Sequence, residues 1–187
     1  EKKMILYYLQ QMDDRILMAI QSLHNPILDV IMPLLSLLGN LGMIWFFAAA
    51  LLLIRKEYRK YSLMIVLAIA TAYLVGELML KPFVGRPRPC QVNEMVPMLV
   101  PVPGSYSFPS GHSASSFAAA MVLLFGNKKF GVAGLVLAVL IAFSRMYLYV
   151  HYPTDVAAGI LLGILSAFLV RWIYQKLERH KEKRQEE

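Results

Sequence analysis

The chain has 187 residues, 58% of them hydrophobic and 17% charged, and its formal net charge is +7. Soluble domains have about 25% charged residues, so this composition indicates an integral membrane protein. The single cysteine, Cys90, excludes an internal disulfide and a zinc framework built on cysteines. The basic residues are divided among short loops and one tail, which argues against nucleic acid as a partner and leaves an anionic lipid open.

The N-terminal segment, residues 1–24, is predicted to be an amphipathic helix at the membrane interface. Its apolar residues recur at helical spacing on one face, at Ile16, Leu17, Ile20 and Leu23. The next apolar run, 26–38, is short for a full crossing, so we expect it to cross only by joining the helix before it. Gly39, Asn40 and Gly42 then predict a turn.

Further apolar runs are separated by charged or turn-forming residues. They cover residues 43–54, 61–80, 112–125, 130–149 and 154–174. Together with the short run, they predict an all-α polytopic membrane bundle of about six transmembrane helices. We expect a single membrane-embedded domain, 1–187, in which residues 81–111 form a long outer loop and residues 175–187 a charged tail.

The basic loops predict how the chain is oriented in the membrane. Lysine and arginine gather at residues 55–60, at 128–129 and along 171–184. With six crossings all three groups fall on one side, which the positive-inside rule identifies as cytoplasmic, together with both termini. The loop 81–111 and the turn at His151 are then expected on the extracytoplasmic face.

Three polar clusters are predicted to meet on this face, and the first runs from Lys81 to Pro89. Lys81, Arg86 and Arg88 lie there against the positive-inside bias. A bound anion accounts for them, because arginine presents a fork of donors that fits phosphate oxygens. The alternative is interfacial anchoring by cations at the end of a helix. Glu77, one turn before Lys81, is expected to pair with it, and the role of Arg86 stays open.

The second cluster is the sequence Pro-Ser-Gly-His at 109–112, which predicts the start of a helix. Ser110 is expected to cap this helix, and Gly111 lets an anion approach the free backbone N–H groups. A plain cap on a membrane helix is the alternative, and it accounts for Ser110 and Gly111 but not for His112. The helix 112–125 is about 21 Å long against a hydrocarbon core of about 30 Å, so we expect His112 below the membrane surface.

The third cluster comprises Arg145, His151 and Asp155. Asp155 follows His151 by four residues and is expected to accept a hydrogen bond from one ring nitrogen, which leaves the other nitrogen free as a nucleophile. The alternative for this pair alone is a surface histidine beside a helix-capping aspartate. The gathering of histidines and cations on one face favours a functional site.

These residue types suit phosphoryl transfer without a metal. We expect a neutral His151 to attack phosphorus and a protonated His112 to donate a proton to the leaving lipid oxygen. Water would then hydrolyse the phosphohistidine that forms. The charge on the phosphate oxygens is stabilised by Lys81, Arg88 and Arg145. The sequence has neither a carboxylate-rich cluster of the kind magnesium prefers nor a clear zinc set, so we expect no metal and no cofactor.

The three clusters resemble the motifs of the type 2 phosphatidic acid phosphatase superfamily. The family pattern is a lysine, six residues and Arg-Pro; then Pro-Ser-Gly-His; then Ser-Arg, five residues, His, three residues and Asp. It matches here in order and without substitution, from Lys81 to Asp155. The resemblance implies a six-helix lipid phosphatase with His151 as nucleophile, Asp155 as its partner and His112 as general acid. The phosphate-binding residues that it implies are Lys81, Arg88, Ser110, Gly111 and Arg145.

The resemblance to small bacterial members of this family implies that the substrate is a lipid phosphate in the bacterial cytoplasmic membrane. Of the possible lipids, undecaprenyl diphosphate is the substrate that we expect, because such members often act on it. Phosphatidylglycerol phosphate and phosphatidic acid are the alternatives, because the motifs recognise phosphate and do not read the lipid tail. The rival class is a lipid-phosphate binder or transporter without activity. Such a protein needs the cations but has no use for His151 with Asp155.

Two further features are open to alternative interpretations. Residues 95–103 form an apolar stretch that is either a lid over the site or a plain covering loop. Gly159 and Gly163 form a GxxxG step, which favours close helix packing inside the bundle, with a dimer contact as the alternative. An oligomer has no other support in the sequence.

Overall fold

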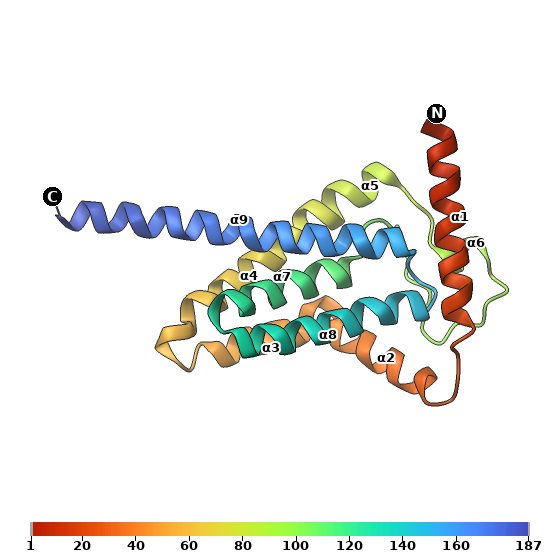
Figure 1. The fold of residues 1–187 in the computed structure, drawn as a ribbon, viewed down its shortest axis with the longest axis horizontal. Coiled ribbons are helices and arrows are strands. Elements are labelled where there is room, and N and C mark those ends of the chain that lie inside the picture. Colours follow the sequence, from red (N-terminus) through yellow and green to blue (C-terminus); the bar gives the residue numbers. More distant parts are fainter. Residues whose placement is uncertain (1, 187) are drawn as a thin grey trace.

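The computed structural model describes residues 2–186, which form helices and no strand (Figure 1). In chain order the elements are α1 (Lys2–Gln21), α2 (Leu28–Gly39), η1 (Asn40–Gly42), α3 (Met43–Leu52), η2 (Lys56–Tyr58), α4 (Arg59–Tyr73), η3 (Leu74–Leu80), α5 (Lys81–Val84), α6 (Pro89–Val92), α7 (Gly111–Gly126), α8 (Lys128–Tyr147) and α9 (Pro153–Glu186). η1 and η2 are 3-10 turns, and η3 is a π-helical segment that continues α4. The predicted all-α membrane fold is confirmed.

The membrane-crossing segments are longer and fewer than predicted. Within residues 2–186, four helical runs are long and apolar enough to cross a membrane, and α7 is a shorter apolar helix. The four runs are Leu28–Leu52, Lys56–Val92, Lys128–Tyr147 and Pro153–Arg184. The predicted short run joins the helix after it rather than the helix before it, because η1 bends the chain without reversing it. Leu41 and Gly42 make this bend with φ angles of 52° and 72°, a region that glycine adopts at little cost. Within residues 2–186, the four runs and α7 thus form five apolar helical segments.

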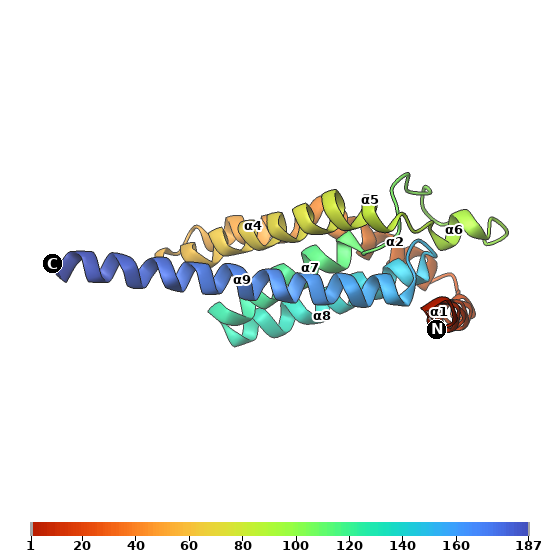
Figure 2. The same cartoon turned by 90° about the horizontal axis from the view of Figure 1, so that it is seen from above.

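The two ends of the chain lie at opposite ends of the bundle (Figure 1). α1 lies across the end at which α8 finishes and α9 starts, as Figure 2 also shows, whereas α9 runs the length of the bundle and beyond it. The described N-terminal helix is thus far from the described C-terminal end of α9 in this structure. Glu1 and Glu187, the outermost residues of the predicted interfacial helix and tail, lie outside the described part of the chain.

α7 occupies the centre of the bundle, where α4, α8 and α9 pack around it. Its buried surface is rich in small residues, among them Ala114, Ala118, Ala119 and Ala120. Small residues let helix backbones approach closely inside a membrane. Trp45 of α3 donates a hydrogen bond from Nε1 to Ser116 Oγ of α7 at 2.9 Å, which satisfies two polar groups in the core.

α9 contacts α7 through Gly159 and Gly163. A Cβ atom added to Gly159 would lie 2.4 Å from the carbonyl oxygen of Ser110, and one added to Gly163 would lie 2.3 Å from that of Ala114. The GxxxG step therefore serves packing inside the bundle, the interpretation that the sequence favoured. Because main-chain atoms meet here, the backbone alone sets the distance between the two helices.

Replacing Gly163 with alanine is expected to lower the free energy of unfolding by about 1–3 kcal/mol, because backbone atoms of α7 cannot turn aside as a side chain does. Thermal unfolding in detergent measures the effect. Gly104→Ala is the matched control, since nothing lies within 4 Å of a Cβ atom at that position. Equal unfolding temperatures for the two variants would contradict the close contact between α7 and α9.

Candidate active site

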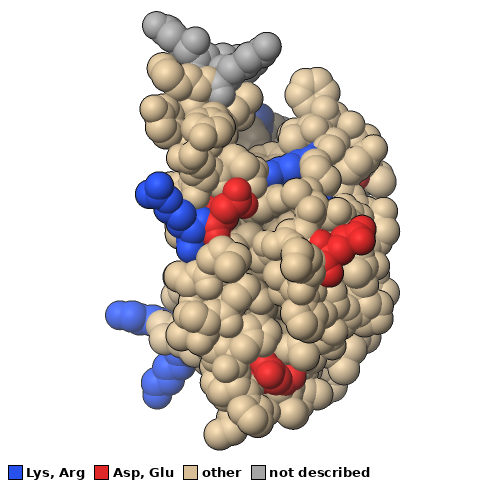
Figure 3. Space-filling model, turned by 90° about the vertical axis from the view of Figure 1, so that its right-hand side faces the viewer, with Lys and Arg blue, Asp and Glu red and all other residues tan. Residues whose placement is uncertain are grey.

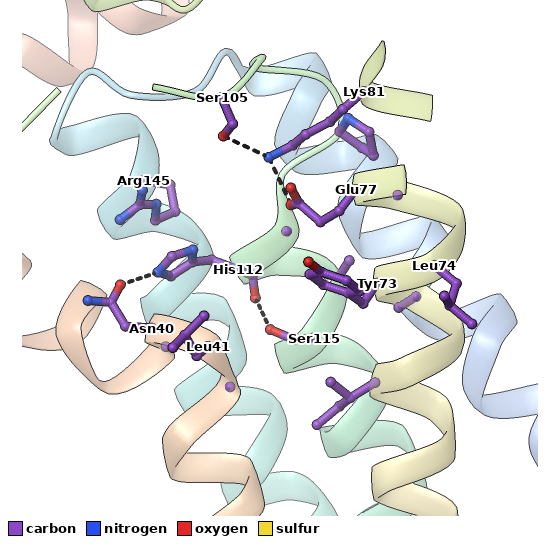
Figure 4. A pocket seen from close by; sticks show the side chains of 18 of the residues that line it. Asn40, Leu41, Tyr73, Leu74, Glu77, Lys81, Ser105, His112, Ser115 and Arg145 are labelled. Atoms are coloured by element: carbon purple, nitrogen blue, oxygen red, sulfur yellow. Dashed lines mark hydrogen bonds and ion pairs between the residues drawn. The ribbon is translucent and has the colours of Figure 1, made fainter. Parts of the chain in front are cut away.

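A cavity of about 710 Å³ lies beside the N-terminus of α7 (Figure 4). The sequence-predicted residues that line it are Lys81, Arg88, Gly111, His112, Arg145 and His151. They come from α5, the start of α6, the start of α7, the end of α8 and the α8–α9 turn. The structure thus brings the three sequence clusters together. Of the predicted site residues, Ser110 and Asp155 lie behind the wall, fully buried.

The rest of the cavity wall is largely apolar. It is formed by residues of α3, α4 and η1, including Phe46, Val66, Ile69, Tyr73 and Leu41. Lys81 and Ser105 lie side by side in the cavity wall (Figure 4). Val66 also lines the cavity and precedes Lys81 by about four helical turns along the α4–η3 run. One space therefore joins a polar end at Lys81 and Ser105 to an apolar region inside the bundle.

Lys81 is buried and paired. Its Nζ lies 2.8 Å from Glu77 Oε1 and donates a hydrogen bond to Ser105 Oγ at 3.4 Å (Figure 4). The predicted Glu77–Lys81 pair is therefore confirmed. Glu77 lies in η3, and Lys81 is the first residue of α5, which continues η3. π-Helical segments frequently occur at functional sites.

Arg88 is 3% exposed and connects the outer loop to His151. Its Nε donates to the carbonyl oxygen of Ser105 at 2.7 Å, and its Nη1 donates to the carbonyl oxygen of Val150 at 2.8 Å. The same Nη1 lies 3.0 Å from His151 Nε2. Ser105 was not predicted as a site residue, because it lies in the outer loop outside all three motifs.

Arg145 is 6% exposed and incompletely bonded. Its Nη1 contacts Ser36 Oγ, and its Nε has no hydrogen-bond partner. In the part of the chain that the structure describes, neither Arg145 nor Arg88 has a carboxylate oxygen within 4.0 Å. Buried charges are normally paired, so these two arginines leave an excess of positive charge at the cavity.

His151 and Asp155 lie close together but beyond hydrogen-bond distance, with Nδ1 of the histidine 3.7 Å from Oδ2 of the aspartate. Ser107 lies beside both side chains. Its Oγ donates to Asp155 Oδ2 at 2.5 Å and is 3.5 Å from His151 Nδ1. The expected direct bond is therefore not formed in this structure, and Ser107 occupies the position between the two groups. No motif signalled this serine.

Burial lowers the pKa of His151 to about 3, and the charges of Arg88 and Arg145 act in the same direction, while Asp155 acts against them. The imidazole is therefore neutral near pH 7. The neutral ring keeps a free lone pair on one nitrogen, which is the form that a nucleophile requires.

The start of α7 has the predicted cap. Ser110 Oγ accepts a hydrogen bond from the N–H of Ser113 at 3.4 Å and another from its hydroxyl at 2.9 Å. Gly111 is next to a carboxylate, since a Cβ atom there would lie 2.5 Å from Glu77 Oε1. In the structure, glycine at this position thus makes room for Glu77 at the N-terminal end of the helix.

His112 faces η1 across the cavity, where its Nε2 lies 2.8 Å from Asn40 Oδ1 (Figure 4). The sequence predicted Asn40 only as part of a turn. Residues 95–103 cover the end of the bundle, because Val96, Met98 and Val100 pack against its buried side chains. Pro103, at the end of this stretch, lines the cavity.

The membrane bundle, its buried cations and the histidines in one cavity define an integral membrane protein with a site for phosphate chemistry. Comparison with known proteins agrees with this class. Residues 61–179 match the model of the PAP2 superfamily, and the chain belongs to that superfamily. Its relatives in that superfamily include membrane proteins named as phosphatases.

The relatives differ in the substrate that their names give. The chain is 38% identical over 127 residues to the undecaprenyl-diphosphatase of Sulfolobus acidocaldarius. The matched region covers 67% of this chain and 61% of the relative, which is less than two thirds of the relative's length. It is 29% identical over 185 residues to the lipid A 4'-phosphatase of Bacteroides thetaiotaomicron, covering 92% of this chain and 81% of the relative. It also resembles the crystal structure of a PAP2 type phosphatidylglycerolphosphate phosphatase from Bacillus subtilis, with a TM-score of 0.73, 30% identity, and coverage of 90% of this chain and 87% of that one.

Proposed function

We propose that the chain hydrolyses a membrane lipid phosphate or diphosphate through a phosphohistidine at His151, with Asp155 as its partner and His112 as general acid. The observation that supports this best is the pair of buried arginines. Arg88 and Arg145 line the same cavity as His151, and neither has a carboxylate partner among residues 2–186. A phosphate group supplies the missing negative charge and accepts hydrogen bonds from both guanidinium groups.

In the first step, Nε2 of neutral His151 attacks the terminal phosphorus, an N–P bond forms and the bond from phosphorus to the leaving oxygen breaks. In a diphosphate, this oxygen bridges the two phosphorus atoms and leaves as part of the lipid monophosphate. In the structure Nε2 of His151 lies 3.0 Å from Arg88 Nη1. An arriving phosphate draws the guanidinium onto its own oxygens, which frees the nitrogen lone pair for attack. Arg88, Arg145 and Lys81 then stabilise the charge on the equatorial oxygens.

His112, in its protonated form, donates its proton to the leaving oxygen. Ser110 and Gly111 hold the free N–H groups of α7 toward the phosphate. In the second step, water attacks the phosphohistidine, His112 takes up the proton that this water loses, and the N–P bond breaks. Inorganic phosphate leaves, and His151 returns to its neutral form.

The substrate that we place first is undecaprenyl diphosphate. A lipid whose tail lies against the apolar wall formed by α3 and α4 presents its phosphate to the cations at the polar end. The similarity to a protein named undecaprenyl-diphosphatase, at 38% identity, supports this choice. Phosphatidylglycerol phosphate and phosphatidic acid remain the alternatives, because the cavity residues that recognise phosphate do not distinguish the tails.

We infer that the cavity faces the extracytoplasmic side of a bacterial cytoplasmic membrane. The turns that carry the basic residues 55–60 and 128–129, and the tail along 171–184, lie at the opposite end of the bundle (Figure 1). Figure 3 looks onto the end that carries α1 and shows mostly uncharged side chains with scattered acidic and basic groups. The positive-inside rule then assigns the tail to the cytoplasm and α1 to the outer interface.

The substrate assignment is tested by measuring phosphate release from purified protein in detergent. Undecaprenyl diphosphate, phosphatidylglycerol phosphate, phosphatidic acid and lipid A are compared at matched surface concentration. We expect kcat/KM to be at least about 10-fold higher for undecaprenyl diphosphate, a difference of about 1.4 kcal/mol in transition-state binding. A preference for any of the other three lipids overturns the substrate, and no release from any of them overturns the proposed reaction.

A further inference from the structure

Arg86 is the one cation of the first cluster that does not line the cavity. Its guanidinium donates four hydrogen bonds of 2.7 Å each, to Thr154 Oγ1, Asp155 Oδ1, Gln10 Oε1 and Asp13 Oδ2. Its Cζ atom lies 3.9 Å from the centre of the Tyr152 ring. A guanidinium that is bonded on two edges and stacked on a ring has one orientation. Arg86 is thus a fixed bridge from α1 to the start of α9.

Asp13 is the α1 end of this bridge. It is 0% exposed, although α1 lies across the outside of the bundle. Its Oδ1 accepts a hydrogen bond from the N–H of Thr154 at 2.9 Å, and its Oδ2 accepts one from the Thr154 hydroxyl at 2.5 Å and one from Arg86 at 2.7 Å. Asp13 therefore caps the first turn of α9 from another helix.

Asp155 is the catalytic end of the bridge. Its Oδ1 accepts the bond from Arg86, while its Oδ2 accepts bonds from Ser107 Oγ and from the N–H of Tyr152 at 2.9 Å. These donors fix the rotation of the carboxylate. That rotation in turn determines the distance from Oδ2 to His151 Nδ1, which is 3.7 Å here.

We propose that Asp13 and Arg86 are positioning residues for the phosphohistidine reaction. Asp13 fixes Arg86, Arg86 fixes Asp155, and Asp155 orients the imidazole of His151. In addition to lying at the interface, α1 then helps to hold the active-site residues in place through Asp13. The inference rests on the proposed function, since it takes Asp155 as the partner of a nucleophilic His151.

The first test compares two aspartates that are neighbours on α1. Asp13→Asn keeps the side-chain volume but replaces an acceptor of Arg86 or Thr154, so we expect kcat to fall about 10- to 100-fold while KM changes less than about twofold. Asp14→Asn is the matched control, because Asp14 is exposed and bonds only Gln10, and we expect its kcat to stay at the wild-type value. Equal kcat values for the two variants overturn the inference.

A double-mutant cycle separates positioning from general destabilisation. If Asp13 acts through Asp155, the variant with both Asp13→Asn and Asp155→Asn is as slow as Asp155→Asn alone. If Asp13 only stabilises the fold, the two losses multiply, and the inference is wrong. Should Asp13→Asn fail to fold, Arg86→Lys gives a second cycle. Lysine keeps the positive charge but lacks the planar fork of hydrogen-bond donors of the guanidinium. We expect about a 10-fold loss of kcat, which likewise does not add to the loss in Asp155→Asn.

The same experiment distinguishes failure of this inference from failure of the proposed function. Trapping of the phosphoenzyme in alkali reports whether His151 is phosphorylated in the wild-type protein. If no phosphohistidine forms during turnover, the proposed function fails. If it forms in the wild-type protein and forms as fast in Asp13→Asn and Arg86→Lys, the proposed function stands and the positioning role fails.

Discussion

Replacing His151 with glutamine is expected to reduce phosphate release by at least about 1,000-fold, because the variant retains the cations but has no nitrogen able to attack phosphorus. His151 is 2% exposed and lines the cavity with one ring nitrogen beside Arg88. Phosphate release in detergent gives the rate, and trapping in alkali shows whether a phosphoenzyme forms. We expect none in the variant.

The matched control for this prediction is His180→Gln. His180 lies in the exposed last part of α9, far along the chain from the cavity residues. We expect its rate to equal that of the wild-type protein. Retention of more than about a tenth of the activity in His151→Gln would show that another group is the nucleophile.

Replacing Arg145 with methionine is expected to lower kcat/KM about 1,000-fold without lowering the unfolding temperature of the ligand-free protein. The activity falls because a cation next to the phosphate oxygens is lost. Stability is kept because Arg145 is buried, has an unbonded Nε and has no carboxylate partner among the described residues. Methionine of similar length removes this buried charge and keeps the packing.

Phosphate release in detergent gives kcat/KM. Thermal unfolding with and without orthovanadate, an analogue of the phosphate in its transition state, gives the stability and the binding of a phosphate-like anion. Vanadate is expected to raise the unfolding temperature of the wild-type protein and of Arg179→Met, an exposed arginine variant, but not that of Arg145→Met. If Arg145→Met unfolds at a much lower temperature than the wild-type protein, or still gains stability from vanadate, Arg145 is a structural residue and not a phosphate ligand.

Helix positions could be predicted from apolar runs where the bilayer sets the length. The run 112–125 is found as Gly111–Gly126, and the run 130–149 as Lys128–Tyr147. The helix predicted at 154–174 continues to Glu186, because the residues after Tyr174 are strong helix formers that need no membrane.

The course of the chain at η1 could not be predicted from the same kind of pattern. A sequence such as Gly-Asn-Leu-Gly permits both a bend and a reversal, and tertiary packing decides between them. Gly39 lies where a Cβ atom would be 2.8 Å from His112 Cδ2 and 2.9 Å from Ile141 Cγ2. α2 is therefore held against α7 and α8 at this point, so the chain continues across the bundle. The sequence contains no signal of that contact.

The candidate site was predictable where residue type and spacing carry the chemistry. Lys81, Arg88, His112, Arg145 and His151 all line one cavity, as the motifs predicted. The residues that were missed contribute through contacts between distant parts of the chain, namely Asn40, Ser105 and Ser107. Single serines and asparagines in loops are too common to indicate such contacts.

Asp13 is different, because the sequence did contain a signal for it. It precedes Leu17 by four residues and Ile20 by seven, so it lies on the apolar face of α1 rather than on the polar one. A carboxylate on the buried face of an amphipathic helix requires a partner. Arg86 was the cation of the first cluster that had no role in the family motifs. In the structure, its Nη2 lies 2.7 Å from Oδ2 of Asp13.

The contact of Gly159 and Gly163 with the backbone of α7 has a consequence for function in different lipids. α7 starts at Gly111 and α9 starts two residues after His151, so the spacing of the two halves of the candidate site depends on main-chain atoms that touch. Side-chain rotamers do not alter it, and neither does stretching or thinning of the surrounding bilayer. Adaptation to bilayer thickness, by tilting or bending, is left to the helices outside this contact between α7 and α9. The catalytic groups can thus keep one separation while the membrane around them changes composition.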